Sequence, residues 1–232
     1  MFIYPAKAEF NRVLPKVKIY PNAKPSKSVK AKFVSQISEI VWKYKLSPET
    51  TNLAARDGFT EVQVFEITLK EPELASEVLI AIDKAIPYPI LYRLLYEGRV
   101  KRVAAYKRPA ADSSGKWLTE TYFETDWTDD IVPAMPLPVA LDLKALYEQM
   151  LFAYIDLPPR AGEALAALVG RVMMIRKCRR DLRALKANMN SEKQFNRRVE
   201  FNAQVREIQE RLRSLTVPGW PGNNNTEKEN VS

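Results

Sequence analysis

Hydrophobic residues in the last third of the chain recur at intervals of three and four positions, in two successive runs. This spacing places the side chains of each run on one side of a helix. The first run comprises Leu165, Leu168, Val172, Ile175, Cys178, Leu182, Leu185 and Met189, and the second comprises Phe195, Val199, Asn202, Val205, Ile208, Leu212 and Leu215. Two such stripes can bury each other, so the pattern predicts an antiparallel helical hairpin over residues 161–216.

The same region indicates where the second helix begins. The segment from Asn188 to Asn190 interrupts the first stripe, and Ser191 is followed three residues later by Gln194. Serine and glutamine at this spacing are typical of a capping box, which predicts a helix N-terminus there. Asn202 lies on the second stripe, where a buried polar side chain would fix the register of the hairpin.

Residues 61–70 show the strict alternation of a strand instead. Phe65 and Ile67 fall on one face of this strand, and Val64 and Glu66 fall on the other. The segment is therefore the clearest predicted strand in the chain.

Helices are predicted on both sides of this strand. Val29, Phe33 and Ile37 begin a helical repeat that predicts a helix over residues 28–45. A second helix is predicted over residues 73–85, because Pro72 suits a first helical turn and apolar residues follow at helical spacing.

Three more strand-like segments follow, with the sequences ILYRLLYE, RVKRVAAYK and WLTETYFETDW. Glu97-Gly98 separates the first two and predicts a hairpin turn. The resulting order indicates an α+β fold, with a mixed sheet of about four strands, two helices on one face and the C-terminal helical hairpin after it.

These elements divide the chain into five predicted parts. Residues 1–28 are rich in proline and lysine and form an extended arm with strand-like pieces around Val13 and Ile19. The others are an α/β domain over 29–130, a linker and connecting helix over 131–160, the hairpin over 161–216 and a disordered tail over 217–232.

Composition excludes several classes of protein. The chain has no histidine, which removes histidine-based triads and histidine zinc sites, and Cys178 is the single cysteine. The N-terminus lacks the pattern of a signal peptide, and no apolar stretch reaches the length of a membrane span. No phosphate-binding glycine motif occurs among the seven glycines. We expect a cytoplasmic protein without a cofactor, and we favour a binding protein over an enzyme.

Charge is spread unevenly along the chain. Residues 171–216 carry thirteen cations and five anions, whereas residues 117–170 carry two cations and nine anions. The candidate binding residues lie off the two stripes and are Arg176, Arg179, Arg180, Arg183, Lys186, Arg197, Arg198 and Arg206. They could meet the phosphates of DNA or an acidic protein partner, or they could be a solvated surface that the acidic segment neutralises.

A metal-dependent nuclease is an alternative interpretation. Such a site needs acidic side chains on a metal and a lysine near the attacked phosphate. Glu66, Lys70, Asp83 and Glu124 are the candidates, but three residues separate Glu66 from Lys70 where restriction-type nucleases have one. Asp142-Leu143-Lys144 has the right spacing but begins a predicted helix.

Several motifs resemble a bacterial family catalogued as domain-of-unknown-function family 4391. They are WKYKLSPETTNL, EVQVFEITLK, LIAIDKAIPYPILY, AYKRP, YFETDW and EKQFNRRVEFN, in this order over roughly residues 10–215. The resemblance implies a product of a phage-defence island, encoded beside helicases and DNA methyltransferases. It supplies no catalytic residue.

Together, these observations favour a non-enzymatic accessory protein of an antiphage defence system. It would dock to a helicase or methyltransferase partner, to DNA, or to both, through the basic hairpin. A divergent nuclease and an antitoxin-like inhibitory binding protein remain the alternatives.

Overall fold

The computed structural model describes residues 2–110, 116–130 and 135–217. The chain forms two compact units, Met1–Asp156 and Leu157–Ser232, which are described in turn. The tail predicted over 217–232 lies, apart from Val217, outside the described residues.

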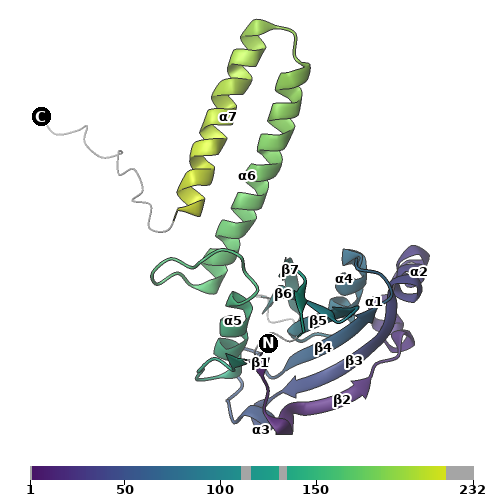
Figure 1. Cartoon of the computed structure of the whole chain (residues 1–232). Helices are drawn as coiled ribbons and strands as arrows, with labels where there is room; N and C mark the ends of the chain where they lie inside the picture. Colours follow the sequence, from purple (N-terminus) through teal and green to yellow (C-terminus); the bar gives the residue numbers. More distant parts are fainter. Residues whose placement is uncertain (1, 111–115, 131–134, 218–232) are drawn as a thin grey trace, which may run out of the picture. The chain divides into compact units, whose positions relative to one another are not determined.

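A mixed sheet is the centre of the first unit (Figure 1). It has seven strands rather than the four or so expected. They are β2 (Glu9–Val13), β3 (Ile37–Leu46), β4 (Val62–Leu69), β5 (Ile90–Tyr96), β6 (Arg99–Pro109), β7 (Trp117–Glu124) and β8 (Thr128–Asp129). Strands β2 to β7 lie side by side in chain order, and β8 also pairs with β6. Only β4 and β5 are parallel; the other neighbours in the sheet are antiparallel.

Short helices and one separate strand pair complete this unit. The helices are η1 (Ala6–Ala8), η2 (Lys16–Lys18), α1 (Tyr20–Ala23), α2 (Lys27–Gln36), α3 (Pro48–Thr51), α4 (Ser76–Ala85) and α5 (Leu143–Phe152). Strands β1 (Phe2–Ile3) and β9 (Met135–Pro136) pair in parallel. The predicted helix over 73–85 is α4, which starts at Ser76 and not directly after Pro72. The segment 1–28, predicted as an extended arm, contains the short elements β1, η1, β2, η2 and α1.

The second half of the helix predicted over 28–45 is a strand. Helix α2 ends at Gln36, and β3 follows directly. Bulges interrupt the pairing of β3 with β4 between Ile37 and Glu39 and between Trp42 and Tyr44. A bulge adds one residue to the two-residue period of a strand. Buried residues in β3 are therefore three positions apart at Ile37 and Ile40, which is why the pattern resembled a helix.

The hairpin turn predicted at Glu97-Gly98 is confirmed. Strands β5 and β6 pair antiparallel on either side of it, with Tyr96 opposite Arg99. Glu97 and Gly98 have φ angles of +47° and +75°. Positive φ at both central positions is the requirement of a type I′ turn, whose twist matches the flanking strands.

One face of the sheet packs against the helices α1, α2 and α4. Phe65 and Ile67 of β4 and Tyr92 of β5 are buried in this core with Val78 and Ile82 of α4. Successive side chains of a strand point to opposite faces, so Glu66 and Arg93 lie on the face away from α4. Charged side chains of neighbouring strands can therefore meet only where they lie on the same face of the sheet.

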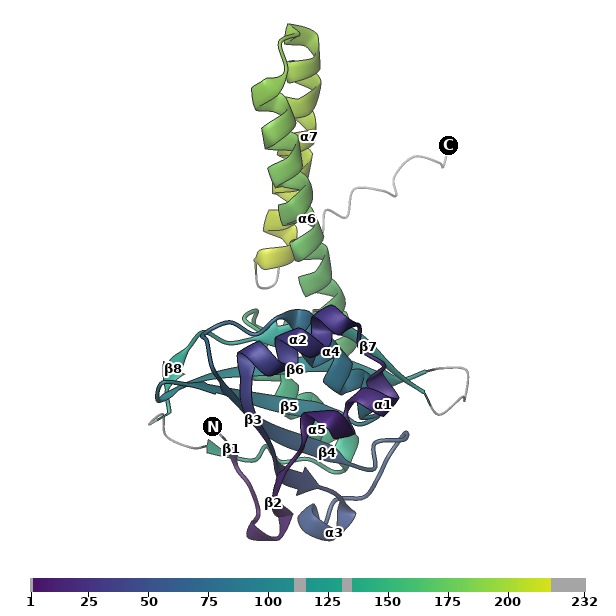
Figure 2. The same cartoon turned by 90° about the vertical axis from the view of Figure 1, so that its right-hand side faces the viewer.

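Two long helices make up most of the second unit, α6 (Leu165–Ser191) and α7 (Phe195–Thr216). They lie side by side in both views (Figures 1 and 2). None of the helices among the described residues has the length and apolar character needed to cross a lipid bilayer.

The helix boundary was predicted incorrectly. Residues 188–190 do not interrupt α6, which continues to Ser191. The Ser191 hydroxyl donates to the carbonyl oxygens of Ala187 and Asn188 in the last turn of α6, so it does not cap the next helix. Helix α7 begins after Gln194 without a side-chain cap.

The apolar stripe of α7 also differs from the prediction in its first half. Phe195 and Val199 are 77% and 52% exposed, and Asn202 is exposed as well, so it does not serve as a buried register residue. The buried and half-buried residues instead follow a line spaced by four and three, namely Phe201, Val205, Ile208, Leu212 and Leu215. At about 100° per residue, Phe195, Val199 and Asn202 lie about 100° to 160° away from this line.

Candidate functional site

A row of cations runs along one side of α6. It continues a line of residues spaced alternately by four and three: Leu165, Val169, Val172, Arg176, Arg179, Arg183 and Lys186. The first three are buried, and from Arg176 onward every member is cationic. Arg180 follows Arg179 and widens the row. We call Arg176, Arg179, Arg180, Arg183 and Lys186 the basic stripe.

The basic stripe is compact. A helix rises 1.5 Å and turns about 100° per residue, so the five side chains fall within an arc of about 120° over a length of about 15 Å. Arg179, Arg180, Arg183 and Lys186 are exposed, and Arg176 is half-buried.

Three exposed cations of the basic stripe are not paired with any described carboxylate. Asp181 is the one acidic residue of α6 and lies on the opposite side of the helix. Among the described residues, no ion pair joins Arg179, Arg183 or Lys186 to a carboxylate. The positive charge of these three residues is therefore not balanced by a described carboxylate.

The cations predicted on α7 do not extend this surface as one row. Arg197, Arg198 and Arg206 are all exposed. The helical rotation places Arg206 about half a turn from Arg197, with Arg198 between them. The structure thus gathers the candidates of α6 on one face and separates those of α7.

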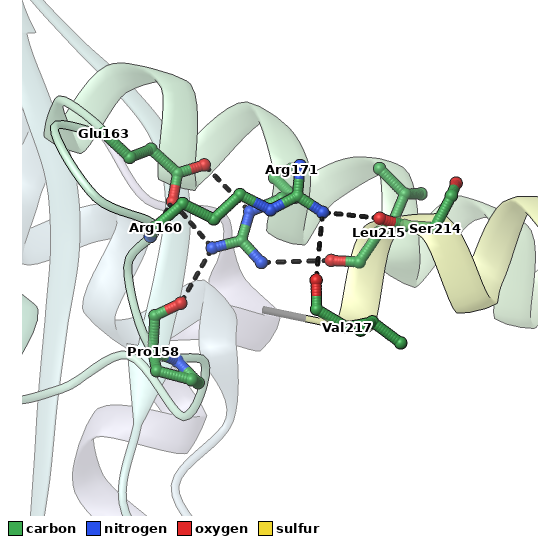
Figure 3. Close-up of polar contacts among 7 residues, drawn as sticks. All are labelled: Pro158, Arg160, Glu163, Arg171, Ser214, Leu215 and Val217. Atoms are coloured by element: carbon green, nitrogen blue, oxygen red, sulfur yellow. Dashed lines mark hydrogen bonds and ion pairs between the residues drawn. The ribbon is translucent and has the colours of Figure 1, made fainter. Parts of the chain in front are cut away.

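An arginine cluster ties the start of α6 to the end of α7 (Figure 3). Arg171 donates from Nη1 to the carbonyl oxygen of Leu215 at 3.0 Å and from Nη2 to that of Pro158 at 2.8 Å. It also donates from Nε and Nη2 to the two carboxylate oxygens of Glu163, at 2.8 and 2.7 Å. Arg160 donates to the carbonyl oxygens of Ser214 and Val217.

This cluster satisfies groups that a helix leaves unpaired. The last carbonyl oxygens of a helix have no partner within it and carry partial negative charge, which guanidinium groups neutralise. The Arg171 and Glu163 side chains are only 6% and 10% exposed. Hydrogen bonds from Arg171 hold the pKa of Glu163 below its ordinary value, with a further contribution from the Arg160 backbone.

Arg171 was not among the predicted residues. Its position carried a signal, because it belongs to the side of α6 with Ile175, Cys178 and Leu182, where the neighbouring side chains are apolar and at least half-buried. A single arginine on an apolar stripe indicates a charge that is paired inside the protein.

The structure does not bring together the candidate nuclease residues. Glu66 forms ion pairs with Arg93 and, at 3.8 Å, with Lys43. Glu124 pairs with Lys101 at 3.0 Å. The other two candidates have different surroundings: Lys70 Nζ donates to the carbonyl oxygen of Val34, and Asp83 is buried among the side chains on the α4 face of the sheet.

No group of three acidic or cysteine side chains within the described ranges could hold a metal ion. The Asp142-Leu143-Lys144 segment begins a helix, as expected. Asp142 is the N-cap of α5 and accepts a hydrogen bond from the Ala145 backbone at 2.8 Å. The arrangement of the described carboxylates therefore lends no support to a nuclease site.

Asp83 instead forms a buried ion pair with Lys107. Lys107 Nζ lies 3.0 Å from Asp83 Oδ1, and both side chains are 1% exposed. Lys107 Nζ also donates to the carbonyl oxygens of Ile86 and Tyr88, at 2.9 and 2.7 Å, just beyond the end of α4. Tyr122 donates to the second oxygen of Asp83. Burial raises the pKa of Asp83 and lowers the pKa of Lys107, while the charge of each partner opposes both shifts.

These contacts indicate a structural role for Asp83 and Lys107. The ammonium group fixes the end of α4 and the turn that leads into β5, and neither group is accessible to a ligand. The sequence analysis assigned Asp83 to the alternative nuclease site and did not connect it with Lys107, because nothing in the sequence shows that the two residues meet.

A family model described as "Domain of unknown function (DUF4391)" matches residues 2–212 of the chain. No curated protein and no solved structure matches it.

Proposed function

Since the chain belongs to the DUF4391 family, whose description assigns no activity, we propose a function from its own surfaces. The protein is a non-enzymatic, cytoplasmic accessory component of a bacterial antiphage defence system. Helices α6 and α7 form an antiparallel helical hairpin, and its basic stripe binds the phosphate backbone of DNA. The same protein docks to a helicase or DNA methyltransferase of the system.

The observation that carries the proposal is the basic stripe. Its cations share one face of α6, most of them are exposed, and no described carboxylate forms an ion pair with Arg179, Arg183 or Lys186. Four of the five are arginines, whose planar guanidinium groups can donate two hydrogen bonds to one phosphate. A rigid helix that holds such groups about 5 Å apart suits a charged polymer better than a single small anion.

The DNA contact can be tested by charge reversal. We expect the Arg179→Glu/Arg183→Glu variant to bind a DNA duplex at least about tenfold more weakly than the unaltered chain at moderate salt, because phosphate contacts become repulsive. Fluorescence anisotropy with a labelled duplex measures the affinity. Binding by the unaltered chain should also weaken steeply as salt rises, since each neutralised phosphate releases counterions.

A matched control separates the basic stripe from net charge. Lys177→Glu/Arg211→Glu changes the charge by the same amount at exposed positions away from the stripe. Equal loss of binding in both variants would show that only total charge matters, and salt-insensitive binding would contradict a phosphate contact.

For the partner, affinity capture from cells that carry the whole gene neighbourhood should recover the helicase or methyltransferase; recovery of neither would contradict that part of the proposal.

A further inference from the structure

Two exposed apolar side chains lie at the start of α7, next to the connection from α6. Phe195 and Val199 are 77% and 52% exposed and occupy successive turns of the helix. Asn202 and Arg206 continue this line at intervals of three and four residues, and both are exposed. We call Phe195, Val199, Asn202 and Arg206 the α7 row. It begins with an aromatic ring and ends with a cation.

The α7 row lies on the same side of the proposed hairpin as the basic stripe. Counted in the direction of the chain, the stripe is centred about 120° around α6 from the apolar side that includes Cys178 and Leu182. The α7 row is centred about 130° around α7 from its buried line at Val205, in the same sense. In an antiparallel pair, equal rotations in the chain direction bring residues of both helices to one side, so the two sets share a surface.

The two sets also match along the length of the hairpin. At 1.5 Å per residue from the helix ends at the connection, Lys186 lies about 8 Å and Arg183 about 12 Å along α6. Val199 and Asn202 lie about 6 Å and about 11 Å along α7. The exposed ring of Phe195 is therefore placed at the end of a cationic track that runs along both helices.

An exposed aromatic ring beside such a track fits a nucleic acid with unpaired bases. Cations follow the phosphates, and the ring offers a flat apolar surface on which a free base can stack. In an intact duplex the bases already stack on one another, so a ring gains a contact only if a base step is forced apart. The surface is thus better suited to a single strand than to a duplex.

We propose that the hairpin prefers single-stranded DNA, with Phe195 stacked on a base and the basic stripe along the phosphates. This inference rests on the proposed DNA contact and on the proposed hairpin, and it specifies the form of DNA that is bound. Val199, on the next turn of the same row, extends the apolar surface beside the ring.

Fluorescence anisotropy on the full chain tests the preference with two probes, a labelled single strand and the duplex formed with its complement. We expect the unaltered chain to bind the single strand more tightly. Phe195→Ala should weaken single-strand binding by about tenfold, the scale of one lost base stack, and should change duplex binding by less than about twofold. Because Phe195 is exposed, its melting temperature should match that of the unaltered chain.

Two further variants separate stacking from a general loss of apolar surface. Phe195→Trp should keep the single-strand affinity, and the single strand should quench the fluorescence of the new indole more than the duplex does. Met173→Ala is the matched control, because Met173 is also an exposed apolar residue, at 44%, but lies near the start of α6. It should bind both probes as the unaltered chain does.

The outcomes distinguish this inference from the proposed DNA contact. If Arg179→Glu/Arg183→Glu weakens binding but Phe195→Ala affects both probes equally or neither, the stripe contact stands and base stacking is wrong. Tighter binding of the duplex by the unaltered chain would also overturn the inference. Unchanged binding of both probes by Arg179→Glu/Arg183→Glu would refute the DNA contact itself, and the surface would then be assigned to an acidic protein segment.

Discussion

Replacing Lys107 by methionine should destabilise the first unit by about 3–5 kcal/mol, the range for breaking a buried ion pair from one side. Methionine matches the length and apolar stem of lysine, so the main loss is the ammonium group. The Asp83 carboxylate would remain buried without its cation, and the carbonyl oxygens of Ile86 and Tyr88 would lose a donor. Urea denaturation followed by tryptophan fluorescence measures the change.

The double variant Lys107→Met/Asp83→Asn is the control for this interpretation. It removes the buried negative charge as well, while the amide oxygen of asparagine can still accept from Tyr122. We therefore expect the double variant to be more stable than Lys107→Met alone, by about 1 kcal/mol or more. If Lys107→Met cost less than about 1 kcal/mol, the ion pair would not be the structural element inferred from its burial.

Replacing Arg171 by methionine should release the end of α7 and lower the stability of the second unit by about 3 kcal/mol. The substitution removes the donors to Leu215 and Pro158 and leaves Glu163 without its guanidinium partner. Hydrogen exchange should accelerate first at the C-terminal turns of α7, and circular dichroism should show earlier loss of helix on heating. Unchanged exchange in α7 would mean that the cluster does not hold the two helix ends.

Glu163→Gln tests the same cluster through its pH dependence. The pKa of Glu163 is lower in the folded protein than its ordinary value of 4.5. A carboxylate with a depressed pKa contributes stability above its ordinary pKa, and this contribution disappears as the pH falls through the folded value. The unaltered chain should therefore lose helix stability below about pH 4.5 more steeply than Glu163→Gln. Parallel pH profiles would contradict the assigned role of Glu163.

Local sequence rules predicted those parts of the fold that depend on neighbouring residues. The alternation around Phe65 and Ile67 identified β4, and Glu97-Gly98 identified the β5–β6 turn. The same rules failed where tertiary pairing decides the structure. In β3, bulges stretched the spacing of Ile37 and Ile40 to that of a helix, and only pairing with the neighbouring strands determines that the segment is extended.

The candidate sites show a similar division. The basic stripe could be predicted, because residues on one side of a single helix follow from spacing alone. The approach of Lys107 to Asp83, and the pairing of Glu66 with Arg93, depend on strand register and on side chains distant in sequence. No local pattern encodes these relations, so sequence reasoning proposed Glu66, Asp83 and Glu124 for a shared site that the structure separates.

The exposed residues of α7 imply that the α6–α7 pair differs in rigidity along its length. Near Arg171, the two helices are joined by hydrogen bonds and buried side chains. At the other end, Phe195 and Val199 face solvent and Met189 is only half-buried. Local unfolding is easiest where few apolar contacts must be broken, so opening should start at the turns around residues 189–199 and leave the fastened end intact. The end near Arg171 would thus stay fixed while the end around residues 189–199 bends. The mobile end could then adjust to the shape of a bound surface without changing how α6 and α7 pack near Arg171.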